Sequence, residues 1–218
     1  MRCMTVGSPS SLFRAGEAMI PTHNTRMGAE WLARMAWENT EGLPCGVIAP
    51  TQRDVRFVCF EGESGLLNII PPELIDQYAS SDLYIRLKNG STIYGYSAEK
   101  ADRLRGPQNF CLWCDEVAAW GTGAEEAWDM AMFGLRLGKN PRVLWTSTPR
   151  PTEFVRMLIK PRERRITIQG STYDNRSNLS ETFFDQVAKY EGTRLGRQEL
   201  YGELIDPEEA GIIKRSWM

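Results

Sequence analysis

The sequence predicts an α/β fold, in which helices flank a mostly parallel sheet. Short apolar runs at 45–49, 110–114 and 142–147 indicate buried strands, because a central strand is apolar on both faces. They alternate with longer segments of helical periodicity, and this alternation favours parallel strands joined by crossover helices. One antiparallel hairpin is expected over 83–96, where Asn89-Gly90 is typical of a two-strand turn.

The first half of the chain gives three further elements. A helix is expected over about 25–39, followed by the strand 45–49, which Pro50 closes. Thr51 is placed to cap the next helix, because its hydroxyl can accept from the first turn. The residues of that helix expected to face the core are Val55, Val58 and Cys59.

In the second half, helices are expected over 124–137, 180–190 and 193–204, and Pro149 stops the strand at 142–148. Residues 1–24 differ from the rest, since glycine, serine and proline separate short apolar pieces. This pattern indicates short β segments and turns. The apolar pieces are 4–6, 11–13 and 18–20.

Composition excludes several classes of protein. The chain has 218 residues and a net charge of −2, so it is not a passive nucleic-acid coat. No run approaches the ~18 apolar residues of a membrane span, and no secretory signal opens the chain. The five cysteines lie mostly in apolar segments, which indicates reduced thiols. Cys111 and Cys114 form a C-x-x-C, but no second pair or nearby histidine would complete a zinc site.

Two adjacent carboxylates, Asp115 and Glu116, end the apolar run at 110–114. Open α/β sheets bind ligands at the carboxyl ends of their strands, and successive strand residues point in opposite directions. One acid could therefore hold Mg²⁺ while the other orients an attacking water, as metal-assisted nucleotide hydrolysis requires. The alternative is a strand that simply leaves the sheet into a polar loop.

Several motifs in fixed order resemble the ATPase domain of the large terminase subunit of tailed bacteriophages, the motor that packages DNA into proheads. The resemblance runs from about Thr25 to Leu204. The segments that carry it are 25–31, 49–51, 61–65, 102–107, 115–116, 146–151 and 192–199. It implies a P-loop NTPase-like sheet of the RecA (ASCE) type, with ATP and Mg²⁺ as cofactors.

The resemblance also implies roles for single residues. Asp115 is similar to the Walker B aspartate that holds the metal, and Glu116 to the general base that polarises water. Thr146 and Thr148 resemble the ends of the coupling motif, whose hydroxyls sense hydrolysis and relay it to DNA movement. Thr25 takes the place of the Walker A threonine, a Mg²⁺ ligand.

Three arginines are further candidates by the same resemblance. Arg26 is next to the Walker A position and is expected to contact the nucleotide. Arg105 is the first candidate for a finger that stabilises phosphoryl charge on a neighbouring subunit, and Arg103 is the second. The alternative is that Arg103 and Arg105 only brace a loop or pair with acids.

The sequence departs from the family where a glycine-rich loop ending in Gly-Lys-Thr should precede the first helix. Pro21-Thr22-His23-Asn24-Thr25 stands there instead. Residues 18–24 resemble the carboxyl end of an intein, and 4–13 resemble the strand segment before it. Such an end breaks the chain when the asparagine amide cyclises onto its own carbonyl, the histidine polarises that bond, and the next residue accepts the acyl group.

These three roles would fall to Asn24, His23 and Thr25, and splicing would join an upstream Gly-Lys to Thr25. His23 is the single histidine of the sequence. The alternative is a drifted P-loop in which His-Asn is a turn. The amino-terminal splicing blocks are not in this chain, so we expect an upstream intein fragment on a separate polypeptide, or a gene start assigned within a longer intein.

The resemblance divides the chain into an intein-like segment (1–24), the ATPase domain (25–205) and the start of a linker (206–218) toward a nuclease domain beyond the end. The expected partners are double-stranded DNA, the terminase small subunit, the portal protein and further copies in a homo-oligomeric ring, in the host cytoplasm. The open alternatives are a helicase-like DNA-dependent ATPase and a catalytically inactive remnant acting as an assembly module. The basic segment 160–165, with Arg156, either contacts DNA phosphates or is a solvated loop.

Overall fold

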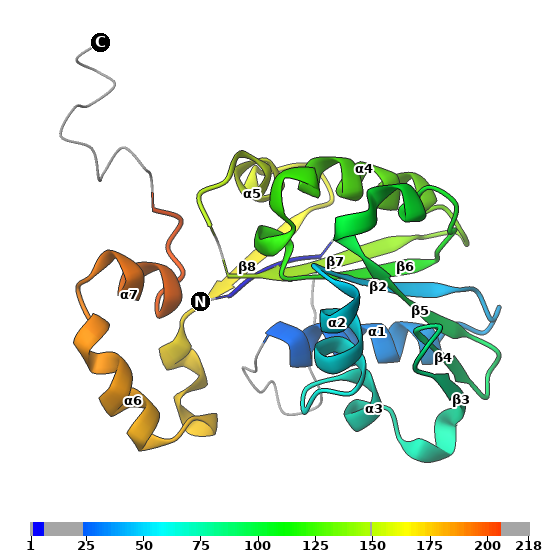
Figure 1. The fold of residues 1–218 in the computed structure, drawn as a ribbon, viewed down its shortest axis with the longest axis horizontal. Helices are drawn as coiled ribbons and strands as arrows, with labels where there is room; N and C mark the ends of the chain where they lie inside the picture. Colours follow the sequence, from blue (N-terminus) through cyan, green and yellow to red (C-terminus); the bar gives the residue numbers. More distant parts are fainter. Residues whose placement is uncertain (1, 7–23, 149, 206–218) are drawn as a thin grey trace, which may run out of the picture.

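The computed structural model describes residues 2–6, 24–148 and 150–205. Their centre is an eight-stranded sheet with the order β3-β4-β5-β2-β6-β7-β1-β8 (Figure 1). The strands are β1 (Arg2–Val6), β2 (Cys45–Ala49), β3 (Ile75–Ala79), β4 (Tyr84–Leu87), β5 (Thr92–Ser97), β6 (Cys111–Asp115), β7 (Arg142–Ser147) and β8 (Ile166–Gly170).

Strands β5, β2, β6 and β7 run parallel to one another, and β3, β4 and β5 form an antiparallel extension. The predicted mostly parallel sheet with a hairpin at 83–96 is therefore confirmed. Strand β1 pairs antiparallel with both β7 and β8. It contains the predicted β segment 4–6, and it lies in the same sheet as the rest of the domain. The pieces 11–13 and 18–20 lie outside the described residues.

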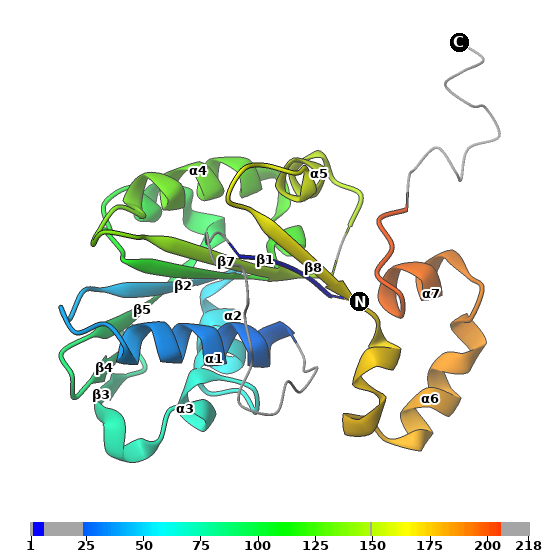
Figure 2. The same cartoon turned by 180° about the vertical axis from the view of Figure 1, so that it is seen from behind.

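Helices cover both faces of the sheet (Figures 1 and 2). One core packs under α1, and the other packs under α4 and α5. The α-helices are α1 (Asn24–Trp37), α2 (Gln52–Asp54), α3 (Leu66–Ile69), α4 (Ala124–Gly134), α5 (Glu153–Ile159), α6 (Glu181–Val187) and α7 (Arg194–Glu199). The π- and 3₁₀-helices are η1 (Val55–Phe60), η2 (Pro72–Leu74), η3 (Ala98–Leu104), η4 (Val117–Ala119), η5 (Gly121–Gly123), η6 (Thr172–Asn178) and η7 (Ala188–Tyr190).

The prediction for the helix after Thr51 is partly wrong. Thr51 does cap it, because its hydroxyl accepts from the backbone N–H of Asp54 at 3.1 Å. Val55 and Cys59 are buried as expected, but Val58 is 40% exposed. The reason is that residues 55–60 form a π-helix, whose wider turn rotates side chains away from α-helical positions.

Other boundaries differ from prediction. The helix expected over 124–137 ends at Gly134, because Leu135 leaves helical geometry and bridges to Asn109 instead. The helices expected over 180–190 and 193–204 are shorter, and the strands β3 and β8 and helix α5 were not predicted. Within the described part of the chain, no helix combines the length and the apolar character that crossing a bilayer requires.

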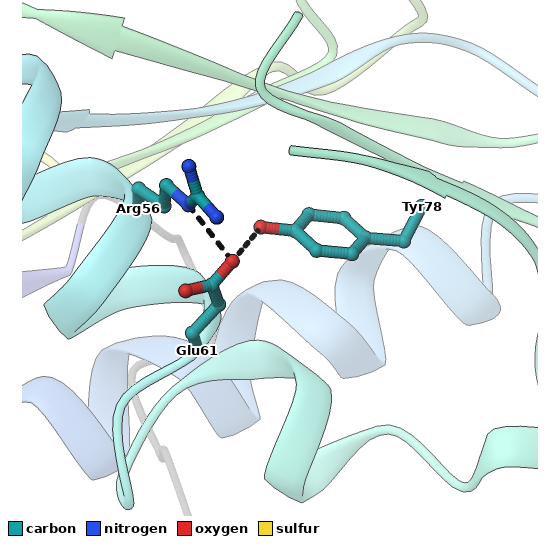
Figure 3. A network of polar contacts seen from close by, with 3 residues as sticks. All are labelled: Arg56, Glu61 and Tyr78. Carbon is teal, nitrogen blue, oxygen red and sulfur yellow. Dashed lines mark hydrogen bonds and ion pairs between the residues drawn. The ribbon is translucent and has the colours of Figure 1, made fainter. Parts of the chain in front are cut away.

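A polar network closes the long connection between η1 and β3 (Figure 3). Glu61 Oε1 accepts from Arg56 Nε at 2.9 Å and from the Tyr78 hydroxyl at 2.7 Å. The pKa of the Glu61 carboxyl is lowered, first by the Tyr78 hydrogen bond and then by Arg56. The pKa of Tyr78 is raised to about 12 by burial and by Glu61. The network therefore ties the end of the π-helix to the edge of the sheet.

Candidate functional site

The carboxyl end of β6 holds Asp115 in a buried hydrogen-bond network. All five residues of β6 are buried, and Asp115 is 5% exposed. Its register partner on β7 is Thr146, whose hydroxyl donates to Asp115 Oδ1 at 2.7 Å. The same hydroxyl accepts from the indole N–H of Trp113 at 2.9 Å. Because a hydroxyl has one proton, the indole fixes its direction toward Asp115.

The second oxygen of Asp115 faces helix α1 and the π-helix. Asp115 Oδ2 lies 3.5 Å from the Thr25 hydroxyl and 3.7 Å from the Cys59 thiol. Burial raises the pKa of the Cys59 thiol and the nearby carboxylate raises it further, so the thiol remains a protonated donor. Sequence reasoning predicted Cys59 as a core residue only, because its contact with Asp115 joins positions far apart in the chain.

Helix α1 reaches this site because Gly28 allows it to lie directly on Trp113. A Cβ atom at position 28 would stand 2.1 Å from two atoms of the indole ring. Real Cβ atoms do not approach so closely, so any side chain there would force the helix or the ring to move. Gly28 therefore allows the first turn of α1 to lie close to Trp113 on β6, and this close packing sets the position of Thr25.

Glu116 points away from Asp115 and toward the end of β7. Its backbone is left-handed, with φ of 47°, which is uncommon for a residue other than glycine. Glu116 Oε1 accepts from the Ser147 hydroxyl and from the backbone N–H of Thr148, each at 3.1 Å. Ser147 Oγ also accepts from the Ala118 N–H at 3.0 Å. The two neighbouring carboxylates thus have different partners, and the left-handed turn at Glu116 contributes to this separation.

The donor set at Asp115 suits a hard cation. Mg²⁺ prefers oxygen ligands and usually keeps several waters, so one carboxylate and one hydroxyl from the protein are sufficient. Asp115 Oδ2 and Thr25 Oγ1 supply these atoms, while Asp115 Oδ1 is held by Thr146. Among the described residues, no cluster of three or more histidine, cysteine or acidic side chains could hold a metal by itself. Cys111 and Cys114 are free and buried, with no zinc cluster around them in that part of the chain.

The structure does not bring the predicted arginines to this network. Arg26 pairs with Glu30 on the surface of α1 at 2.6 Å. Arg103 and Arg105 are exposed at the end of η3. In the basic segment, Arg165 donates to the carbonyl of Leu158 at 2.6 Å and so braces the end of α5.

Three of the remaining predicted residues meet at one edge of the sheet, namely Thr25, Asp115 and Thr146. Thr148 contacts Glu116 at the same edge through its backbone N–H. Asn24 is the first residue of α1. His23 lies outside the described residues. Ser147 was not singled out as a site residue, although it lies inside the motif 146–148 that was. Its hydroxyl could have been recognised as a partner for Glu116 only by knowing the turn that follows β6.

Comparisons with known proteins give the family. The model described as "Terminase large subunit, T4likevirus-type, N-terminal" matches residues 24–218. The large terminase ATPase domain of Thermus phage P74-26 is similar in fold, with a TM-score of 0.54 and 15% identity over 83% of this chain and 84% of that chain.

The large terminase of another thermophilic bacteriophage, solved in complex with ADP, gives a TM-score of 0.65 and 17% identity over 82% of this chain and 44% of that chain. The same terminase with ATP-γ-S gives 0.59 and 16%. No curated protein matches the chain. The expectation of a RecA-like ATPase fold is confirmed by these structures. Because the family model covers well over half of the chain, this protein belongs to the terminase large subunit family of T4-like type and carries its N-terminal domain.

Proposed function

We propose that this domain binds ATP with Mg²⁺ and hydrolyses it to drive DNA packaging, once its phosphate-binding loop is complete. The observation that carries the proposal is the meeting of Thr25, Asp115, Glu116 and the end of β7 at one edge of the sheet. The phage terminase solved with ADP and with ATP-γ-S supports nucleotide binding by this fold. Membership of the family supports DNA as the molecule that is moved.

Asp115 Oδ2 and the Thr25 hydroxyl would hold the Mg²⁺, which supplies neutralisation of charge on the β and γ phosphates. The hydrogen bond from Thr146 holds Oδ1, while Oδ2 faces the Thr25 hydroxyl and the Cys59 thiol. The buried position of Asp115 also limits competing water. The protein would thus hold the two oxygen ligands, Asp115 Oδ2 and Thr25 Oγ1, next to each other before the metal and nucleotide bind.

Glu116 would accept the proton of the attacking water as its oxygen forms a bond to the γ phosphorus. One carboxylate oxygen, Oε1, is held by Ser147 and by the N–H of Thr148, which leaves Oε2 for the water. Thr148 follows directly after β7, so a change in the charge of Glu116 would alter its hydrogen bond to the backbone N–H of Thr148. This link supports the proposed role of Thr146 and Thr148 in coupling hydrolysis to movement.

The proposed roles of Arg26, Arg103 and Arg105 do not depend on contact with Asp115 or Glu116 in a single copy of the protein. Arg105 remains the first candidate for a finger that acts on a neighbouring copy in a ring, since its exposed side chain can reach a partner, and Arg103 is the second. Arg26 would contact the nucleotide only after leaving Glu30, from which it lies 2.6 Å away.

The proposed activity depends on splicing between Asn24 and Thr25, because Pro21 to Asn24 provide neither the glycines nor the lysine that hold phosphates. Two observations support a junction at this point. The family match begins at residue 24, and the Thr25 hydroxyl lies 3.5 Å from Asp115 Oδ2, which is consistent with a Walker A threonine at this position. Residues 1–24 would then be the carboxyl end of an intein.

ATP hydrolysis by two forms of the protein tests the proposal. The chain as it stands should show negligible hydrolysis, whereas the form joined at Thr25 to an upstream Gly-Lys loop should be active. In the joined form, Glu116→Gln should lower kcat about 10²–10⁴-fold. Turnover by the unjoined chain equal to that of the joined form would overturn the need for splicing. Failure of the joined form to bind nucleotide would favour an inactive assembly module, which the incomplete loop makes the second candidate.

In the proposed setting, the joined protein works in the host cytoplasm as a homo-oligomeric ring. Its partners would be double-stranded DNA, the terminase small subunit and the portal protein, with an upstream intein fragment acting before assembly. The alternative is a helicase-like DNA-dependent ATPase, which would work with a second RecA-like domain. Packaging of a defined DNA by the joined protein with its own prohead would distinguish the two.

A further inference from the structure

The backbone of Glu116 is held in a conformation that glutamate does not favour. Its φ of 47° and ψ of 49° lie in the left-handed region, where a residue with a Cβ atom is strained. Such a residue keeps this conformation only when the surrounding structure imposes it. Because the conformation decides where the Glu116 carboxylate points, the groups that impose it also set the position of that carboxylate.

Trp120 closes the turn that begins at Glu116. Its indole N–H donates to the backbone carbonyl of Asp115 at 3.0 Å, so the two ends of the turn are joined. Within the turn, the backbone N–H of Ala119 donates to the carbonyl of Glu116 at 2.8 Å. Trp120 is 5% exposed, so little water competes for the indole N–H. The left-handed residue is therefore enclosed between the carbonyl that Trp120 holds and the short helix η4.

Aromatic packing fixes the direction of the Trp120 ring. The indole stacks on Phe154 of α5, with ring centroids 6.4 Å apart and an angle of 24° between the planes. Trp128 of α4 packs edge-on against the same phenyl ring, with centroids 6.1 Å apart. All three rings belong to the core under α4 and α5, which lie on one face of the sheet (Figure 1). The indole N–H is thus aimed at the carbonyl of Asp115 by the core.

The indole hydrogen bond differs in kind from the other contacts of this turn. Ser147 Oγ accepts from the N–H of Ala118 at 3.0 Å and donates to Glu116 Oε1 at 3.1 Å. Those two bonds connect the turn to β7. The bond from Trp120 connects the turn to its own start, and so it acts on the path of the backbone. Loss of the indole N–H would leave Glu116 its hydrogen-bond donors and change only how well it meets them.

We propose that Trp120 is a positioning residue for Glu116. Its indole N–H keeps the left-handed turn in which the Glu116 carboxylate faces Ser147 and the backbone N–H of Thr148. The inference rests on the proposed function, in which this carboxylate accepts the proton of the attacking water. A small misplacement of a reacting group lowers the rate strongly, whereas nucleotide binding depends on other residues. Loss of the indole N–H should therefore act on kcat and not on KM.

Two changes at position 120 test this role in the protein joined at Thr25. Trp120→Phe removes the N–H and part of the ring, while a tryptophan analogue with sulfur in place of the ring nitrogen removes the N–H and keeps the shape. Both should lower kcat for ATP hydrolysis by about 10–10²-fold and leave KM within about twofold. Trp128→Phe, in the same aromatic cluster but on α4, is the matched control and should leave both constants unchanged. An unchanged kcat with the sulfur analogue, or a rise in KM equal to the loss of kcat, would overturn the proposal.

Amide hydrogen exchange at Thr148 tests the same role in the full chain, without hydrolysis or splicing. This amide donates to Glu116 Oε1, so its protection reports the position of the carboxylate. The sulfur analogue at Trp120 should speed its exchange roughly tenfold, Trp128→Phe should not, and Glu116→Ala gives the upper limit. Unchanged exchange with the analogue would overturn the proposal even if the joined protein hydrolysed ATP. Faster exchange in a protein whose joined form is inactive would retain the positioning of Glu116 and remove the proposed ATPase.

Discussion

The hydroxyl of Thr146 donates a 2.7 Å hydrogen bond to Oδ1 of Asp115, across two strands in which these residues are register partners. The hydroxyl is completely buried, and Trp113 donates to it from the other side. The chain of Trp113, Thr146 and Asp115 therefore fixes one oxygen of the carboxylate and leaves the other facing Thr25. The position of the proposed metal ligand is set by the core of the domain.

The first prediction concerns Thr146→Val, which keeps the shape of the side chain and removes the hydroxyl. The indole N–H of Trp113 and Asp115 Oδ1 would both lose a partner in a buried site. At about 1–3 kcal/mol for each unsatisfied group, the free energy of unfolding should fall by roughly 2–6 kcal/mol. Urea denaturation measures this change.

Thr148→Val is the matched control, because Thr148 engages Glu116 and Ser147 through its backbone N–H and carbonyl. Its free energy of unfolding should change by no more than about 0.5 kcal/mol. Equal losses in the two variants would mean that the hydroxyl of Thr146 has no special part in the network.

The second prediction concerns Gly28→Ala. In an open helix position this change would stabilise by about 1 kcal/mol, because alanine is the better helix former. Here the new Cβ would meet Trp113 at 2.1 Å, and overpacking of a core costs about 1–3 kcal/mol. We expect net destabilisation, measured by urea denaturation. Gly106→Ala meets nothing within 4 Å and should be nearly neutral, so stabilisation of Gly28→Ala would contradict the contact.

The sequence was sufficient to locate the end of β6, because an apolar run that stops at two acids is a local signal. The cap at Thr51 was likewise local, and the structure confirms it. Strand β3 was missed since it lies in the antiparallel extension, half-exposed and rich in polar residues, with no clear alternation. The π-helix was missed because α-helices and π-helices contain the same kinds of apolar residues. They differ in the number of residues per turn, which the sequence pattern does not show over so short a segment.

Contacts between distant positions could not be read from the sequence. Cys59 and Asp115 meet because the π-helix packs beside α1, and no pattern within either segment records this. The left-handed backbone at Glu116 is equally hidden, since glutamate does not favour it. The antiparallel pairing of β1 with both β7 and β8 is likewise defined only by the assembled sheet.

The third prediction concerns Ser147→Ala in the protein joined at Thr25. Without the hydroxyl, Glu116 keeps one of its two donors and Ala118 N–H loses its acceptor, so the carboxylate is less well oriented. Misplacement of a reacting group costs roughly 10² in rate. We expect kcat for ATP hydrolysis to fall by about that factor while KM changes little.

The control for this variant is Ser180→Ala, which removes the hydroxyl that caps the start of α6, an element that contributes no residue to the site. It should leave both kinetic constants near those of the joined protein. A rise in KM with an unchanged kcat for Ser147→Ala would instead mean that Ser147 acts on nucleotide binding.

The fourth prediction concerns pH and the network of Arg56, Glu61 and Tyr78 (Figure 3). The pKa of Tyr78 is raised to about 12 in the folded protein, against about 10 in an unfolded chain. Because the folded value is the higher one, this phenol contributes stability that is fully present below about pH 10 and is lost as pH rises toward 12. Urea midpoints of the wild-type protein should therefore fall over this range more steeply than those of Tyr78→Phe.

On the acid side the sign is reversed, because the pKa of Glu61 is lowered, first by the hydrogen bond from Tyr78 and then by Arg56. The stability due to Glu61 is present above its unfolded pKa of about 4.3 and is lost as pH falls through the lower folded value. Tyr78→Phe removes the larger cause and Glu61→Gln removes both, so acid dependence should weaken in that order. If the urea midpoints of all three proteins ran parallel at every pH, the network would contribute nothing that titrates, and the connection between η1 and β3 would be held by packing alone.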